Sequence, residues 1–197
     1  MSRHETKKHL TPFVQSLRGA IETFESLQAL EAPVVVAAEL VLTTLRAGGK
    51  LLLCGNGGSA ADSAHIATEF SCRFQEDRRP YPAIGLSADG GLLTAIGNDY
   101  AFQEIFSRQV RAYGKPGDVL IALSTSGKSR NVLSAVEEAR RLGVKSIALL
   151  GKGGGFTKGA SDLEIIVPGT VTARIQEAHK FLLHVICELV EPGLEKE

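Results

Sequence analysis

Residues 50–59 read KLLLCGNGGS, and this segment decides the fold. The run 50–54 is almost wholly apolar and short, which is typical of a strand buried on both faces of a parallel sheet. A glycine-rich turn follows it, and from Ser59 the apolar residues recur at helical spacing. Glycine after a strand lets the backbone approach a ligand closely. The segment therefore predicts a strand, a glycine-rich turn that either binds a ligand or only packs, and a helix.

The same alternation continues along the chain. Further apolar runs lie at 83–87, 119–124, 146–150 and 163–167, and helical patterns separate them at 59–74, 101–112, 131–142 and, briefly, near 156–160. Because strands alternate with helices, the sequence predicts an α/β fold with a doubly wound, five-stranded parallel sheet of the flavodoxin-like kind.

Helical segments precede and follow this core. The spacing over 11–45 predicts two helices before the first strand, and 171–190 predicts one long terminal helix. The terminal helix is apolar around more than half of its circumference, which indicates packing against other subunits as well as its own sheet. We expect a single domain over 1–197, in which 1–48 is a helical segment packed in an oligomer and 49–191 holds the core and the terminal helix.

Composition excludes several classes of protein. The 197 residues include 22 Lys+Arg and 22 Asp+Glu, so the formal charge is zero and argues against nucleic-acid binding by bulk electrostatics. Three widely spaced cysteines (Cys54, Cys72 and Cys187) favour a reducing cytoplasm over a disulfide framework. A polar N-terminus and the lack of a run of about 18 apolar residues predict neither a signal peptide nor a membrane span.

A second turn is rich in hydroxyl groups. Residues 124–129 read STSGKS at the end of the third apolar run, and a helix is expected to follow them. Hydroxyl groups and backbone N–H groups at a helix start can surround a phosphate. One serine could serve only as a helix cap, but four hydroxyl groups in six residues exceed that need. The turn is a candidate phosphate site.

Two helices carry chemically active side chains. His65 and Glu69 are four residues apart, so they share one helix face and could hold a metal ion or substrate, or form an ordinary solvated pair. On the terminal helix, Gln176 and His184 lie about 80° apart in angle and about 12 Å apart in rise. They converge only if their side chains lean together or if neighbouring subunits contribute. His179 is expected to be a satisfied polar group inside a helix bundle.

Two polar segments are less specific. Asn98 and Asp99 are expected in a loop, where they could bind sugar hydroxyls or turn the chain. Arg73, Arg78 and Arg79 are expected to be solvated, with phosphate contact as the alternative.

Taken in order, these motifs resemble the sugar-isomerase (SIS) domain, and within it the phosphoheptose isomerases. The matching residues are Gly55-Asn56-Gly57-Gly58-Ser59, His65, Glu69, Gly97-Asn98-Asp99, Ser124-Thr125-Ser126-Gly127, Ser129, Arg174-Ile175-Gln176-Glu177, His179 and His184. The resemblance covers nearly the whole chain. It implies a bacterial cytoplasmic homotetramer, with active sites at subunit interfaces, that converts sedoheptulose 7-phosphate to D-glycero-D-manno-heptose 7-phosphate. That reaction is the first step toward ADP-heptose for lipopolysaccharide and related surface glycans.

The resemblance also implies the roles of individual residues. Phosphate would be held by Ser124, Thr125, Ser126 and Ser129, and the sugar by Asn56, Gly57, Gly58, Ser59, Glu69, Asn98, Asp99 and Gln176. One Zn²⁺ per subunit would be bound by His65, Glu69, Gln176 and His184. One departure is Ala173, where some members of the family have an acidic residue.

An aldose–ketose isomerisation through an enediol needs a base for the carbon proton and an acid for the oxygens. Glu69 is the candidate base and His184 the candidate acid. The alternative is a non-catalytic SIS scaffold that binds the DnaA replication initiator, although such a relative lacks the glutamate that matches Glu69. A sugar-phosphate-sensing regulator is a third reading, but the residues before the first strand contain no basic recognition helix.

Overall fold

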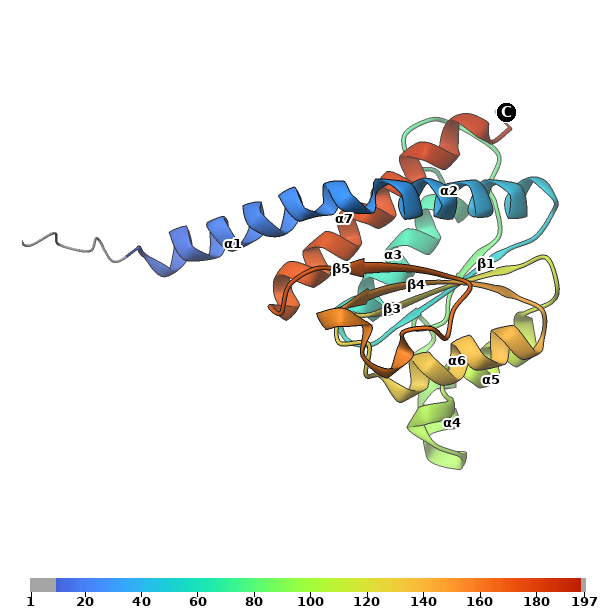
Figure 1. Cartoon of the computed structure of the whole chain (residues 1–197). Helices are drawn as coiled ribbons and strands as arrows, with labels where there is room; N and C mark the ends of the chain where they lie inside the picture. Colours follow the sequence, from blue (N-terminus) through green and yellow to red (C-terminus); the bar gives the residue numbers. More distant parts are fainter. Residues whose placement is uncertain (1–9, 196–197) are drawn as a thin grey trace, which may run out of the picture.

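A computed structural model of the chain describes residues 10–195, and it confirms the predicted α/β architecture (Figure 1). The sheet is parallel, with strand order β2-β1-β3-β4-β5. Its strands are β1 (Leu51–Gly55), β2 (Ala83–Gly85), β3 (Val119–Ser124), β4 (Lys145–Gly151) and β5 (Leu163–Val167). Every predicted strand is present, with bounds shifted by two residues at most. The polar residues 1–8, which argued against a signal peptide, lie outside the described part of the chain.

Helices cover both faces of the sheet (Figure 1). They are α1 (Pro12–Ser26), α2 (Glu31–Arg46), α3 (Gly58–Ser71), α4 (Gly90–Asp99), α5 (Ser107–Tyr113), α6 (Arg130–Arg141) and α7 (Thr172–Val190), with the 3-10 turns η1 (Leu27–Leu30), η2 (Phe102–Glu104), η3 (Lys152–Thr157) and η4 (Glu191–Gly193). In β1, Leu51 and Leu53 face the core under α2, α3 and α7, whereas Leu52 and Cys54 face the core under α4, α5 and α6. Burial on both faces explains why the strands are continuously apolar.

The N-terminal helices form an arm. The helix α1 extends beyond the body of the molecule (Figure 1), and none of its residues is buried. By length and hydropathy alone, the run Pro12–Arg46 would pass as a membrane span, although no run of about 18 apolar residues predicted one. This is weak evidence, since 33% of its apolar window is buried inside the protein and core helices pass the same test. The helix α2 contributes Val34, Val41 and Leu45 to the core beside α7.

One predicted loop is wrong. Asn98 and Asp99 are the last two residues of α4, not part of a loop. The helix starts after Asp89, whose side chain accepts a hydrogen bond from the backbone N–H of Leu92 at 2.9 Å. This N-cap converts the turn-like sequence Asp-Gly-Gly into the beginning of a helix. The expected helix near 156–160 is likewise replaced by η3, in which three consecutive glycines have positive φ.

Candidate active site

Two of the predicted motifs lie side by side at the carboxyl edge of the sheet. Because β1 and β3 are neighbours, the turns that follow them are adjacent. The side-chain amides of Asn56 and Asn131 exchange hydrogen bonds of 2.9 and 2.7 Å. This amide pair connects the glycine-rich turn to the first turn of α6. Ligands of doubly wound sheets bind at this edge.

The hydroxyl-rich turn is held in a fixed conformation. The Ser124 hydroxyl donates to the Ser129 hydroxyl at 3.2 Å, and the Ser126 hydroxyl accepts from the N–H of Lys128 at 3.1 Å. Gly127 has φ +61°, and its carbonyl accepts from the hydroxyl and the N–H of Thr157. A side chain at Gly127 would place its Cβ 1.9 Å from the carbonyl oxygen of Gly154. The turn therefore has little freedom to move, as a preformed anion site requires.

The histidine and glutamate side chains form a compact cluster between α3 and α7. His65 Nε2 lies 3.3 Å from Glu69 Oε1 and 3.1 Å from His184 Nε2. One ligand atom from each of the three residues lies within 4.8 Å of the others. The ring of Phe74 stacks on His184, with centroids 6.0 Å apart. The structure thus brings His184 to the His65 and Glu69 of its own chain.

These donors suit a zinc ion. Two imidazole nitrogens and one carboxylate oxygen are ordinary zinc ligands, and a tetrahedral site with metal–ligand bonds of about 2.0–2.1 Å has ligand–ligand edges of about 3.3 Å. The separations of 3.1 and 3.3 Å match such edges. The three residues therefore fit the metal that the sequence predicted, with a fourth position left for another donor.

Gln176 lies farther along the same pair of helices. Its amide packs against Gly58, so a Cβ added at Gly58 would lie 1.7 Å from Gln176 Nε2. Gly58 precedes His65 by about 10 Å along α3. Between them, Lys180 pairs with the buried Asp62 at 3.1 Å. A cleft of about 270 Å³ opens here, lined by Asp62, Ala173, Gln176, Glu177 and Lys180. Within one chain, the side chain of Gln176 therefore packs on the glycine-rich turn and not on the histidine cluster. A bond from Gln176 to the metal stays a prediction.

Asn98 and Asp99 stand apart from this cluster. The helix α4 packs through Ile96 on the face of the sheet opposite α3 and α7. The Asn98 amide donates to the Asp99 carboxylate at 2.8 Å, and Asp99 lines a separate pocket beside Tyr100 and Arg108. Their contact with the sugar also stays a prediction.

His179 is only partly satisfied. Its Nε2 donates to the carbonyl oxygen of Leu150 at 3.1 Å, but its buried Nδ1 has no partner among the described residues. Burial lowers the pKa of His179 to about 4, against smaller opposing effects of the hydrogen bond to Leu150 and of the carboxylate of Asp62. His179 is therefore neutral in the folded protein at neutral pH.

Two side-chain contacts were not predicted from the sequence. Arg78, expected to be solvated, is only 4% exposed, and its Nε donates to Glu191 at 3.1 Å. Asn131 was overlooked as the partner of Asn56. Neither contact has a local signal, since 113 and 75 residues separate the partners.

The chain is similar to known proteins of one family. Residues 13–151 match the family model described as "SIS domain". The chain is 48% identical to a phosphoheptose isomerase of Trichlorobacter lovleyi, covering 91% of this chain and 92% of that protein, and 50% identical to one of Rhodospirillum rubrum, covering 89% and 93%. It also superposes on the solved phosphoheptose isomerases of Neisseria gonorrhoeae (TM-score 0.81, 44% identity, covering 91% and 95%) and Francisella tularensis (TM-score 0.84, 39% identity, covering 91% and 94%).

Proposed function

Because the chain belongs to the phosphoheptose isomerases of the SIS-domain family, we propose that it converts sedoheptulose 7-phosphate to D-glycero-D-manno-heptose 7-phosphate. The observation that carries this proposal is the meeting of His65, Glu69 and His184 on α3 and α7, the two helices that also meet at the glycine-rich turn through Gly58 and Gln176. The relatives named above give no support to a DnaA-binding scaffold. The product would enter the synthesis of ADP-heptose.

The hydroxyl-rich turn is the proposed phosphate-binding site. The turn from Ser124, at the end of β3, to Ser129, the N-cap residue of α6, also contains Thr125 and Ser126. Backbone N–H groups at the start of α6 favour an anion there. The sugar would extend toward α3 and α7 along Asn56, Gly57, Gly58, Ser59 and Gln176, with Asn98 and Asp99 as the further sugar contacts. Binding energy from the distant phosphate would then fix the reacting carbons against the catalytic groups.

Glu69 is the proposed base. Its carboxylate would remove a proton from C1 of the ketose and return it to C2, while His184 would protonate the carbonyl oxygen on C2 and accept the proton of the C1 hydroxyl. The C=O bond moves from C2 to C1 through an enediol, and no proton is gained or lost overall. Both groups belong to the same cluster, and the side chain of Glu69 is 17% exposed, which leaves it accessible to a ligand.

His65, Glu69 and His184 would hold one Zn²⁺, with Gln176 as the proposed fourth ligand. When bound, the ion supplies positive charge that stabilises negative charge on the substrate oxygens. The separations within the cluster support this assignment.

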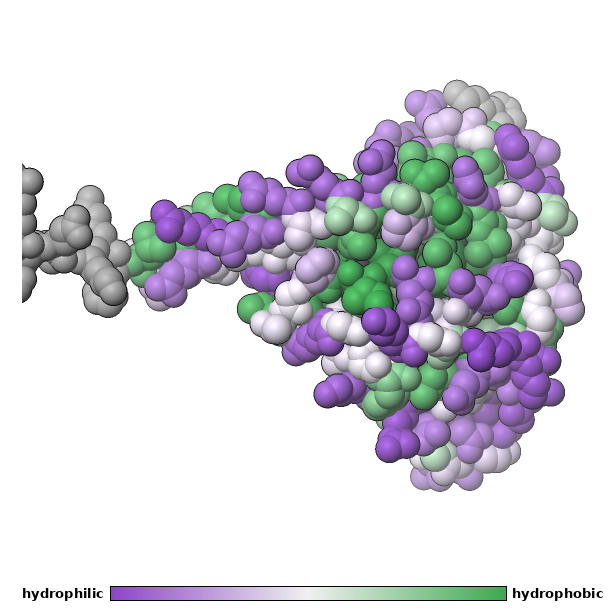
Figure 2. All heavy atoms as spheres, in the orientation of Figure 1, coloured by the Kyte–Doolittle hydropathy of each residue, from purple (hydrophilic) through white to green (hydrophobic). Residues whose placement is uncertain are grey.

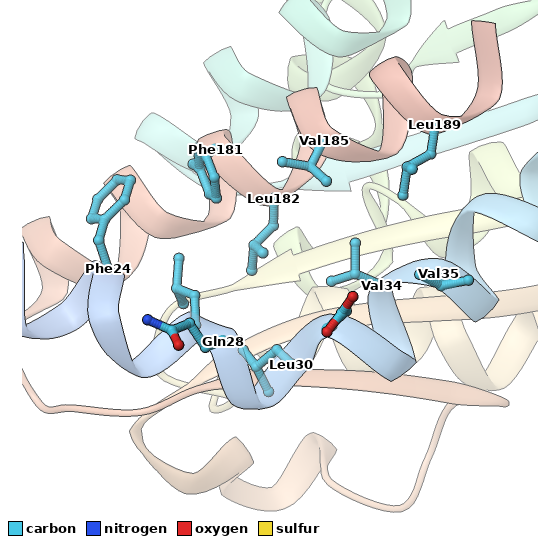
Figure 3. Close-up of a pocket in the computed structure, with 11 residues that line it drawn as sticks. Phe24, Gln28, Leu30, Val34, Val35, Phe181, Leu182, Val185 and Leu189 are labelled. Carbon is cyan, nitrogen blue, oxygen red and sulfur yellow. The ribbon is translucent and has the colours of Figure 1, made fainter. Parts of the chain in front are cut away.

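We also propose a homotetramer with active sites at its subunit interfaces. An apolar groove of about 360 Å³ lies between the N-terminal helices and α7, lined by Phe24, Val35, Phe181 and Leu189 among others (Figure 3). Hydrophobic side chains also follow the projecting helix α1 (Figure 2), where Phe13 is 75% exposed. Neighbouring copies would cover this surface. The enzyme would work in the cytoplasm, because a charged sugar phosphate does not cross membranes freely.

The test is an assay of the purified protein with sedoheptulose 7-phosphate, in which the aldose product is followed by NMR. We expect turnover by the wild type and loss of about 10²-fold or more in kcat for Glu69→Gln, the range for removal of a general base. The variant should still bind the sugar phosphate. Wild-type turnover by Glu69→Gln would remove Glu69 from its role, and an inactive wild type would contradict the proposed reaction.

A further inference from the structure

Arg78 caps the helix that carries the proposed base. Its guanidinium lies under the last turn of α3, where Nη1 donates to the carbonyl oxygen of Phe70 at 3.0 Å and Nη2 donates to the carbonyl oxygen of Glu69 itself. Carbonyl groups in the last turn of a helix lack partners within the helix, and a cation there also interacts favourably with the helix dipole. The backbone of Glu69 is thus held by Arg78.

Glu191 holds Arg78 from the other side. It follows α7 directly, is 8% exposed, and accepts a hydrogen bond from Arg78 Nε at 3.1 Å. Its carboxylate also accepts from the N–H groups of Phe74, Gln75 and Glu76 at 3.0–3.3 Å. Burial acts to raise the pKa of Glu191, but these hydrogen bonds and the guanidinium lower it overall. The carboxylate is fully satisfied as a buried anion.

The same network reaches His184. The N–H of Phe74 donates to Glu191, and the ring of Phe74 stacks on the imidazole of His184. Glu191 lies seven residues beyond His184, so its carboxylate also fixes the end of the helix that carries this histidine. Glu69 and His184 come from different helices, and the Arg78–Glu191 pair ties both helices together behind the cluster.

We propose that Arg78, held by Glu191, is a positioning residue that sets the distance between Glu69 and His184. It acts through the backbone of Glu69 and through Phe74. The expected effect on kcat rests on the proposed function. The expected effect on Zn²⁺ affinity rests on the geometry of the cluster alone.

A matched control exists on the opposite face of the sheet. Glu138 of α6 is 7% exposed and accepts hydrogen bonds from Arg111 and Arg141 at 2.6–3.4 Å. Its helix packs in the core shared with α4 and α5, apart from α3 and α7. Glu138→Gln therefore removes a carboxylate of the same kind, with the same loss of charge, away from the cluster.

The experiment compares Glu191→Gln, Arg78→Lys and Glu138→Gln with the wild type. Affinity for Zn²⁺ is measured by competition with a chromophoric chelator, kcat and KM with sedoheptulose 7-phosphate, and stability by urea unfolding. For Glu191→Gln we expect Zn²⁺ affinity to fall about 10-fold to 100-fold, as for loss of an outer partner of a metal ligand, and kcat to fall by a similar factor. KM should stay within about twofold of the wild-type value, because the proposed phosphate-binding turn follows β3 and has no contact with Glu191.

Arg78→Lys should also lower Zn²⁺ affinity and kcat while KM is nearly unchanged, but by smaller factors than Glu191→Gln. A lysine keeps the charge opposite Glu191, but its ammonium is a point donor and does not reproduce the planar fork that spans two carbonyl groups. Glu138→Gln should lower stability and leave Zn²⁺ affinity and kcat unchanged.

The proposal would be overturned if Glu138→Gln lost as much Zn²⁺ affinity and as much kcat as Glu191→Gln. It would also be overturned if Zn²⁺ affinity and kcat stayed within twofold of the wild type in both Glu191→Gln and Arg78→Lys. Failure of both these variants to fold, with Glu138→Gln folded, would make the pair a folding element and overturn its positioning role. If the wild type did not turn over this sugar phosphate, the proposed function would fail, and the Zn²⁺ affinities would still decide the role of Arg78.

Discussion

The buried imidazole of His179 predicts a specific loss of stability in mild acid. Its folded-state pKa of about 4 is below the ordinary value of 6.5. Between these values the unfolded chain binds a proton on this residue and the folded chain does not, so acid favours unfolding. The stabilising contribution is fully present above pH 6.5 and is lost as the pH falls toward 4. Linkage gives a loss of about 2 kcal/mol between pH 7 and pH 5, and about 3 kcal/mol by pH 4.

Between pH 7 and pH 5, the loss of stability due to His179 can be distinguished from the loss due to carboxylates with lowered pKa values. Hydrogen bonds from Arg141 and Arg111 lower the pKa of Glu138 to about 2, so its contribution is lost only as the pH falls below its ordinary value of 4.5. The lowered pKa values of Asp162 and Glu191 act in the same acidic range.

The assay is urea unfolding at pH 7, 6 and 5, at one protein concentration and with chelator present, for the wild type and His179→Gln. The glutamine amide can donate to the carbonyl of Leu150 in place of Nε2–H, and it does not titrate. We expect the wild type to lose about 2 kcal/mol more than the variant between pH 7 and pH 5. Parallel pH profiles for the two proteins would refute the reasoning, whatever their absolute stabilities.

Three further predictions concern the site and the assembly. Removal of metal with a chelator should lower kcat by at least about tenfold, and added Zn²⁺ should restore it in a coupled assay; full activity without metal would contradict the assignment. Gly127→Ala should cost at least about 2 kcal/mol, from positive φ and the clash with Gly154, and should raise KM for the sugar phosphate, measured by urea unfolding and kinetics. Phe181→Asp, at a side chain that is 43% exposed in the single chain and packs on Phe24, should shift sedimentation toward smaller species, and an unchanged sedimentation coefficient would exclude this groove as an interface.

The sequence predicts the parts of this protein that depend on local pattern. Continuous apolar runs identify the strands because burial on both faces removes the need for polar residues. The pairing of His65 with Glu69 follows from helical geometry alone, whereas their meeting with His184 depends on the relative placement of α3 and α7 and was indicated only by the family resemblance. The burial of Arg78 could not be predicted in this way, because its partner Glu191 lies 113 residues away.

Other features also depend on long-range geometry. The position of Gln176 against Gly58 requires the relative placement of α3 and α7, which spacing within one helix does not contain. The assignment of Asn98 and Asp99 to a loop was wrong because Gly97, Asn98 and Asp99 are residue types typical of turns, whereas α4 continues through Asp99.

In the proposed tetramer, the helical order of the projecting helix α1 would depend on the concentration of the protein. A 15-residue helix with no buried residues is marginal in water by itself. Within one chain α1 contacts α7 through the rings of Phe24 and Phe181 and through the hydrogen bond from Arg174 to the carbonyl oxygen of Ser16. The rest of its apolar face would gain stability from another copy, so dilution should loosen this arm while the sheet remains intact. Amide exchange in α1, followed across a dilution series, would thus report how many molecules are assembled.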